Sequence, residues 1–311
     1  MKINERNYCM FDIFVDSGAN IPSEIVARHD ITVMQLNLTI DGRSIPSFVP
    51  DLTPEQEREK AHEYYQAIRE GAVVNTSLVN SYEFEDAFRK SLEDGRDVLC
   101  FTMSANISGT YNAARLTTED LREEFPDRKI YLIDSMNASL GEGILAIYAA
   151  EMRDSGKGID EIYDYLCETV HKMNGVFTVE DLKYIARTGR LSNTEALVGN
   201  LLGIKPLLKG SKDGWIVAFK KVRGRKKVLN DLADLFASNI ENPEDQIVGI
   251  AHADAYEDSL YVMNRVLERI KVREFINTPY DYGTGSHVGP GTIAVFFVAK
   301  DRELEKSFDH D

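Results

Sequence analysis

The 311-residue chain has little cysteine and a deficit of positive charge. Cys9, Cys100 and Cys167 are too few and too widely spaced for a disulfide framework or a zinc site, and none forms a Cys-x-x-Cys pair. Three isolated thiols fit a reducing compartment. Lys and Arg number 36 against 51 Asp and Glu, so the net charge is −15. This balance argues against a general binder of nucleic acid or anionic membranes, which needs a positive surface.

Long apolar runs and nucleotide-binding motifs are also missing. The longest apolar run, Ile293 to Ala299, is far shorter than the roughly 20 residues of a membrane-spanning helix. Residues 1–10 contain no apolar stretch of the kind found in secretory signals. Neither a Gly-x-Gly-x-x-Gly nor a P-loop spacing occurs. We therefore expect a soluble, cytoplasmic protein with no cofactor, no metal and no nucleic-acid partner; peripheral contact with a membrane stays open.

The chain does contain a regular alternation of strand-like and helix-like segments. Apolar residues make up 43% and charged residues 28%, the balance of a globular protein. Val98–Thr102 and Ile130–Ile133 are short, apolar and separated by a helical segment, which predicts βαβ crossovers and a mainly parallel sheet covered on both faces. Ile204–Leu208 and Trp215–Lys220, joined by a polar turn, predict a β-hairpin.

These patterns predict an α/β fold with two domains. Residues 1–170 are expected to form an N-terminal, parallel-sheet, Rossmann-like domain, and residues 171–311 a C-terminal α+β domain. A helix over Ile159–Met173 is expected to bridge them. Thr53 and Gln56 predict a capping box at the start of another helix. Further helices are expected to begin at the cap Ser81 and near Tyr111 and Lys226.

Hydroxyl-bearing residues gather after the predicted N-terminal strands. They are Ser17, Thr76, Ser77, Ser104, Ser108, Thr110, Ser135 and Ser139. Because ligands bind at the carboxyl edge of open α/β sheets, these loops predict a ligand site. Ser108 to Thr110 also precede a helix, where free N–H groups and the helix dipole favour an anion. A carboxylate or a phosphate held by neutral donors would fit. Ordinary helix capping is the alternative explanation.

Two acidic residues and a glycine-rich loop offer an enzymatic alternative. Asp16 and Asp134 each precede a serine at a strand end, and His287 stands among four glycines in residues 283–291, a loop that can bend tightly and approach a ligand. A flexible loop with an incidental histidine is the alternative. A self-sufficient metal-dependent phosphotransferase or hydrolase would use these three groups. Two carboxylates without a supporting cluster are weak evidence for a metal, and such Asp residues most often cap the following helix.

A basic stretch offers a third hypothesis. Residues 220–227 read KKVRGRKK, with six positive residues in eight. This local reversal of charge would dock an acidic partner or bind phosphate, and a solvated helix start explains it as well. Arg187 to Arg190 form a second basic turn, one of whose arginines is a candidate to pair with neighbouring acids.

Taken in order, these segments resemble the DegV family of bacterial fatty-acid-binding proteins along nearly the whole chain. Leu78 to Asn80 depart from the usual Gln-Pro-Ser of the family. The matching motifs are Asp16 to Pro22, Asn75 to Ser77, Ser108 to Ala114, Ile133 to Ser135, Ser139 to Gly141, Leu182 to Ser192, Ile204 to Pro206, Arg223 to Lys227 and His287 to Gly291.

The resemblance implies a carrier that encloses one long-chain fatty acid, of the palmitate, stearate or oleate class, in a tunnel between its two domains. Family motifs place the carboxylate at Thr76 and Ser108, with Ser77, Gly109 and His287 beside them. Some members are the acyl-carrying subunit of a fatty acid kinase, presenting the carboxyl group to a separate ATP-binding subunit that makes acyl phosphate. By that similarity Arg223 and His287 would assist phosphoryl transfer or partner docking, and the chain would have no complete active site of its own.

Overall fold

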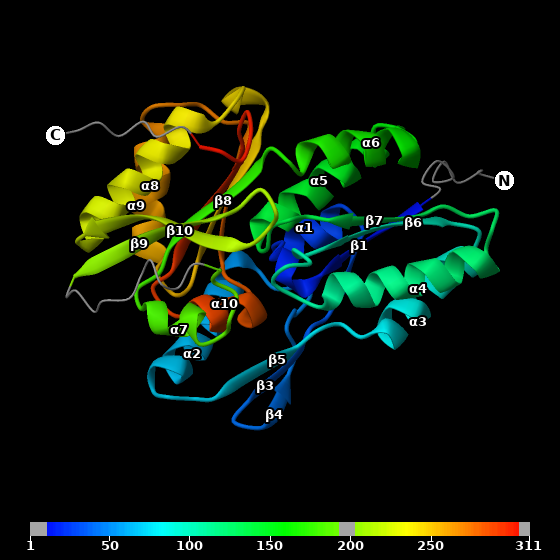
Figure 1. Ribbon diagram of the computed structural model, residues 1–311, viewed down its shortest axis with the longest axis horizontal. Coiled ribbons are helices and arrows are strands. Elements are labelled where there is room, and N and C mark those ends of the chain that lie inside the picture. Colours follow the sequence, from blue (N-terminus) through cyan, green and yellow to red (C-terminus); the bar gives the residue numbers. More distant parts are fainter. Residues whose placement is uncertain (1–10, 193–202, 305–311) are drawn as a thin grey trace.

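The computed structural model describes residues 11–192 and 203–304, whose two larger sheets occupy the two halves of the molecule (Figure 1). Residues 1–10 lie outside this range, and with them Cys9 and the expectation about a secretory signal. Cys100 and Cys167 are free thiols. No helix in the described ranges is both long enough and apolar enough to cross a membrane.

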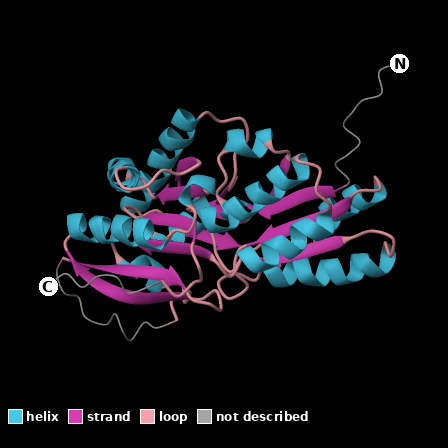
Figure 2. Cartoon of the chain, turned by 90° about the horizontal axis from the view of Figure 1, so that it is seen from above, coloured by secondary structure: helices cyan, strands magenta, loops and turns pink. Residues whose placement is uncertain are grey.

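The first half contains a four-stranded, fully parallel sheet in the order β2-β1-β6-β7. Helices lie on both sides of its strands (Figure 2). The observed parallel sheet confirms the predicted fold class, because each crossover between neighbouring parallel strands needs an intervening helix. The strands are β1 (Phe11–Asp16), β2 (Ile31–Met34), β6 (Asp97–Thr102) and β7 (Ile130–Asp134).

The helices of this half carry the sequence signals that predicted them. Thr53 caps α2 (Pro54–Arg69) in a capping box with Gln56, as expected. The N-cap of α3 (Ser81–Glu93) is Asn80 rather than the predicted Ser81, because Asn80 forms its own capping box with Glu83. The remaining helices are α1 (Ser23–Arg28), α4 (Thr110–Glu124), α5 (Leu140–Asp154) and α6 (Ile159–Thr169).

A small antiparallel sheet, β4-β3-β5, stands apart from the parallel one. Its strands are β3 (Asn37–Ile40), β4 (Arg43–Ile45) and β5 (Val74–Ser77). Thr76 and Ser77 therefore lie on a strand paired with β3, not in a loop at the edge of the parallel sheet, and that expectation is wrong. Alternate residues of β5 are exposed, so the strand carries no continuous apolar run that would mark it in the sequence.

The second half contains a six-stranded mixed sheet in the order β10-β9-β8-β13-β11-β12. The predicted hairpin is confirmed, since β9 pairs with β10 in antiparallel register. The helix expected over Ile159–Met173 ends at Thr169, and Met173 begins β8 instead. The strands are β8 (Met173–Thr178), β9 (Ile204–Gly210), β10 (Ile216–Arg223), β11 (Ile247–His252), β12 (Glu274–Pro279) and β13 (Ile293–Val298).

The helices of the second half include one that the sequence analysis missed. Residues 283–288 of the predicted glycine-rich loop belong to a helix, α10 (Tyr282–Val288), whose N-cap Asp281 accepts a hydrogen bond from Thr284 N–H. That cap offsets the low helix propensity of glycine. The other helices are α7 (Leu182–Ala186), α8 (Arg225–Asn239) and α9 (Tyr256–Leu267).

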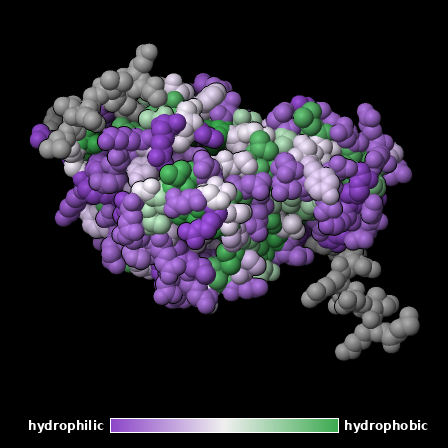
Figure 3. All heavy atoms as spheres, turned by 90° about the horizontal axis from the view of Figure 1, so that it is seen from below, coloured by the Kyte–Doolittle hydropathy of each residue, from purple (hydrophilic) through white to green (hydrophobic). Residues whose placement is uncertain are grey.

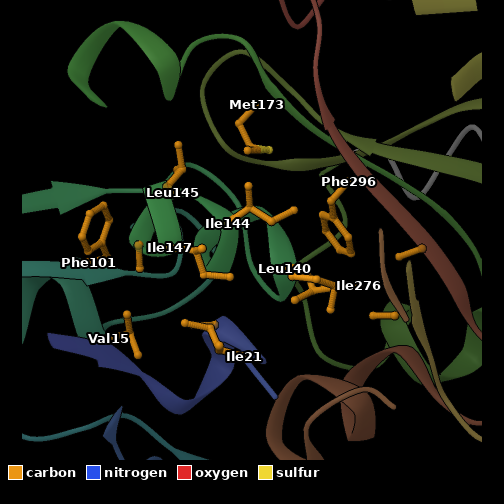
Figure 4. Close-up of a cluster of buried hydrophobic side chains, with 14 of the residues drawn as sticks. Val15, Ile21, Phe101, Leu140, Ile144, Leu145, Ile147, Met173, Ile276 and Phe296 are labelled. Atoms are coloured by element: carbon orange, nitrogen blue, oxygen red, sulfur yellow. The ribbon is translucent and has the colours of Figure 1, made fainter. Parts of the chain in front are cut away.

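Helix α5 joins the two halves through a shared core. It contacts β1 and β6 of the parallel sheet as well as β8, β11 and β13 of the mixed sheet. Leu140, Ile144 and Ile147 of α5 lie between Phe101 on one side and Phe296 on the other (Figure 4). The two sheets thus share one hydrophobic cluster. The domain division at residue 170 stays a prediction.

Candidate ligand-binding site

A cavity of about 360 Å³ lies where the two halves meet. Phe177, Ile216 and Phe296 of the six-stranded sheet line one side of it, and Leu36 and Met103 of the first half also contribute. Hydrophobic areas also reach the surface between the two halves, within a largely hydrophilic face (Figure 3). A mostly apolar cavity with a few polar groups is the usual form of a small-molecule site.

Thr76 and His287, 211 residues apart, meet at this cavity. Thr76 Oγ1 and His287 Nε2 are 2.8 Å apart, and both residues line the cavity. Strand β5 supplies the threonine and α10 the histidine. Burial, together with the charges of Arg190 and Arg187, lowers the pKa of His287 to about 4. The imidazole is therefore neutral at pH 7, and it provides one donor and one acceptor.

Ser108 lies on the cavity wall just before α4. Its hydroxyl oxygen accepts a hydrogen bond from Thr110 N–H at 3.2 Å and lies 2.9 Å from Thr110 Oγ1. A Cβ at Gly109 would come within 2.9 Å of Leu78 Cδ2, so glycine permits the segment after β5 to approach this turn closely. All five residues that the sequence analysis placed around a carboxylate line the cavity: Thr76, Ser77, Ser108, Gly109 and His287.

The other hydroxyls of the predicted set are divided between the cavity and the loops. Ser139 lines the cavity. Ser17, in contrast, bonds to Ser47 and to Leu36 N–H, and Ser104 donates to the carbonyl of Gly214. Thr110 and Ser135 are likewise absent from the cavity lining. Helix capping, the alternative explanation, does not account for Ser17 and Ser104, because their partners lie in segments distant in the sequence.

Arg190, of the predicted basic turn, is a cavity residue that the sequence analysis did not assign to the ligand site. It lines the cavity, and its guanidinium donates to the carbonyls of Ile107 and Thr188 rather than pairing with neighbouring acids. The cavity therefore has a cation at its wall in addition to the neutral donors that the hydroxyl-bearing loops predicted. The sequence signal was the turn at Gly189, whose φ of 71° reverses the chain just before Arg190.

Arg223, the other predicted assisting residue, lies elsewhere. It is exposed at the end of β10 and is not among the residues lining the cavity. Within the basic stretch, Arg225 donates to Asp258 and to the carbonyl of Gly291, and Lys220 pairs with Asp231 at 2.8 Å. Part of this stretch is therefore engaged within the second half, and its role in docking stays a prediction.

Asp16 and Asp134 hold loops in place. The carboxylate of Asp16 accepts hydrogen bonds from Gly18 N–H at 2.8 Å and Met103 N–H at 2.9 Å. Burial raises the pKa of Asp16 to about 7. Asp134 accepts a hydrogen bond from Met136 N–H at 2.8 Å. Within residues 11–192 and 203–304, no three His, Cys, Asp or Glu side chains group to hold a metal ion.

Comparison with known proteins decides the family. The sequence model of a protein family, described as "Uncharacterised protein, DegV family", matches residues 10–300 of this chain. The chain belongs to the DegV family. A DegV domain-containing protein of Clostridium perfringens is 38% identical over 294 residues, which cover 94% of this chain and 99% of the relative.

Solved structures of DegV proteins share this fold, and several of those proteins are described as fatty-acid binding. A Thermotoga maritima protein whose structure is described as revealing a fatty-acid-binding function has a TM-score of 0.77 and 29% identity, with coverage of 94% of this chain and 99% of the other. A stearic-acid-binding protein of Eubacterium ventriosum has a TM-score of 0.79 and 25% identity, with the same coverage. The resemblance inferred from the motifs is confirmed at the level of family and fold.

Proposed function

We propose that this DegV protein binds one long-chain fatty acid, of the palmitate, stearate or oleate class, in the cavity between its halves. The carboxylate is held by Thr76 and Ser108, with Ser77, Gly109 and His287 beside them. One observation carries the proposal: Thr76 and His287 pair at 2.8 Å on the wall of a mainly apolar cavity that Ser108 also lines.

The energetics of a fatty acid fit such a cavity. Each methylene removed from water contributes about 0.8 kcal/mol, so a 16-carbon chain supplies most of the affinity. A buried carboxylate is costly unless several hydrogen bonds satisfy it. The hydroxyls and the neutral imidazole supply donors, and the Arg190 guanidinium adds a positive charge at the same wall. The polar groups therefore select a carboxylic acid over a hydrocarbon.

We further propose that the protein acts as a carrier that presents the carboxyl group to an ATP-binding kinase subunit. There, a carboxylate oxygen would attack the γ-phosphorus of ATP and release ADP. A second cavity, of about 520 Å³, supports this proposal because it adjoins the first at Thr76 and His287. Arg187, Thr188 and Arg190 also line it. A polar opening with two arginines suits a transferring phosphoryl group. Arg223, outside both cavities, would contact the partner.

Lipid analysis of the purified protein tests the carrier function. We expect mass spectrometry of an organic extract to recover one long-chain fatty acid per chain, and delipidated protein to take up added palmitate or oleate. Recovery of no fatty acid, together with no uptake, would overturn the proposal. The kinase step is tested separately, by adding an ATP-binding kinase subunit and looking for acyl phosphate.

A further inference from the structure

The loop between β7 and α5 forms part of the cavity wall in an unusual backbone conformation. Met136 and Ser139 have φ angles of 51° and 57°, a region that residues other than glycine seldom adopt. Met136, Asn137, Ala138 and Ser139 all line the cavity. Strained positions persist only where their surroundings hold them, and they gather at ligand clamps. The backbone of Met136 must therefore be held by contacts with its surroundings.

Hydrogen bonds hold Met136 on both sides of its strained backbone. Its N–H donates to Asp134 Oδ1 at 2.8 Å, and its carbonyl accepts a hydrogen bond from Arg302 Nη2 at 2.8 Å. Arg302 follows β13, so this second contact crosses from the mixed sheet to a loop of the parallel sheet. Asn137, the next residue, donates to the carbonyl of Met173 at 3.2 Å.

Arg302 is an unusual residue for such a contact, because it is only 3% exposed. Among the described residues, its Nε and Nη1 have no hydrogen-bond partner. Burial lowers the pKa of Arg302 to about 10. A Cβ at Gly210 would overlap the guanidinium, so a glycine on β9 makes room for it. A buried cation with so few acceptors is costly. The hydrogen bond from its Nη2 to the Met136 carbonyl fixes the backbone of the cavity wall.

The backbone of Met136 lies close to two glycines of the cavity wall. The carbonyl oxygen of Met136 would lie 3.7 Å from a Cβ at Gly210, and its Cα 3.4 Å from one at Gly214. Both glycines line the cavity, together with Ile216 and Phe296. Methionine is flexible and polarisable, so it fills irregular apolar space well. Met136 also packs against the hydrophobic cluster that the two sheets share, so a change in the size of its side chain would alter the packing at this wall.

We propose that Met136 determines which acyl chains fit the cavity, and that Arg302 is the positioning residue that holds Met136 in place. This inference rests on the proposed fatty-acid binding and adds a selectivity element to it. It predicts that substitution at Met136 changes the preferred chain length, while the carboxylate contacts at Thr76 and Ser108 stay as they are.

Competition among fatty acids tests the role of Met136. Delipidated protein is given an equimolar mixture of saturated acids from 12 to 20 carbons, and the retained lipids are measured by mass spectrometry. Met136→Ala is expected to shift retention toward longer chains, by about fourfold in relative affinity for each methylene accommodated. Met136→Phe is expected to shift it toward shorter chains. Met263→Ala is the matched control and keeps the wild-type profile, because Met263 lies on α9 and packs against a separate core cluster.

Arg302 is tested by the same profile, with stability measured in parallel. Arg302→Gln is expected to broaden the range of chain lengths retained, and Arg302→Lys to restore part of the selectivity. If Arg302 had a purely structural role, its substitution would lower the Tm and leave the chain-length profile unchanged. If the wild-type protein binds fatty acids but both Met136 variants keep its profile, this inference is overturned and the carrier function stands. If the wild type binds none, both proposals fail.

Discussion

At the scale of single residues, hydrogen-bonding groups and their burial define the proposed head-group site. Thr76, Ser108 and His287 each have polar partners already, and all three line the cavity. The sequence motifs identified these residues individually. Their meeting could not be derived from the sequence, because Thr76 and His287 come from segments 211 residues apart. The basic turn at Arg190 was recognised, but its place at the cavity could not be derived, because the turn is held against Ile107, 83 residues away.

Removing the two hydroxyls should weaken fatty-acid binding. In Thr76→Val combined with Ser108→Ala, each lost hydrogen bond to a charged group should cost roughly 1.5–3 kcal/mol, at least tenfold in Kd per site. Isothermal titration with palmitate measures the change. Thr169→Val removes a hydroxyl that bonds to Tyr165 on α6, and serves as a control that leaves affinity unchanged. Unaltered affinity in the double variant would place the carboxylate elsewhere.

His287 should make the stability of the protein depend on pH in a defined window. Burial is the main cause that lowers its folded-state pKa to about 4, whereas the unfolded value is about 6.5. Between these values the unfolded chain binds more protons, so this contribution to stability is present above pH 6.5 and is lost as the pH falls toward 4.

Thermal unfolding of the wild type and of His287→Gln, measured from pH 4 to pH 8, checks this dependence. Glutamine keeps a hydrogen-bonding partner for Thr76 but does not titrate. The difference in Tm between the two proteins should shrink, or change sign, as the pH falls below 6.5. A constant difference over the whole range would show that His287 titrates normally.

At the scale of elements, α2 and α10 show which local signals suffice. The capping box of α2 predicted its start, because it is a property of residues close together in the sequence. The four glycines near His287 suggested a loop, but α10 forms because Asp281 caps it and the hydroxyl of Tyr64 donates to the carbonyl of Tyr282. That second contact is tertiary, so it left no trace in the local sequence.

The glycines of α10 should be needed for close packing rather than for flexibility. A Cβ at Gly285 would overlap the hydroxyl of Tyr65, which donates to the carbonyl of Tyr280. Gly285→Ala should therefore lower stability by about 1–3 kcal/mol through overpacking. It should also weaken palmitate binding by displacing His287. Gly158→Ala, at a position with no atom within 4 Å and φ of −76°, is the control. Equal Tm values for the two variants would contradict this account.

At the scale of the whole molecule, the cavity depends on two sheets that share the core helix α5. The parallel sheet and the hairpin followed from strand and helix alternation, and both were predicted correctly. The six-stranded order β10-β9-β8-β13-β11-β12 could not be predicted, because it joins strands distant in the sequence. A cavity-lining residue such as Phe296 and a core residue such as Phe297 also look alike in sequence, although they lie side by side on β13.

A ligand bound between the halves should stabilise the whole chain. Anything that binds only the folded state raises its stability by RT ln(1 + [L]/Kd), which is about 2.7 kcal/mol at a ligand concentration of 100 Kd. The Tm of delipidated protein should therefore rise with palmitate concentration, in one cooperative transition. Hexadecane, which lacks the carboxylate, should give a smaller rise. A Tm that is insensitive to palmitate would argue against binding in the shared core.

A crystal structure of the delipidated protein reloaded with palmitate tests the central claim most directly. The account predicts elongated density in the cavity, with the carboxylate within hydrogen-bond distance of Thr76 and Ser108 and the chain against the wall that contains Phe177 and Phe296. Density with the carboxylate away from Thr76 and Ser108, or a lipid bound outside the cavity, would contradict it.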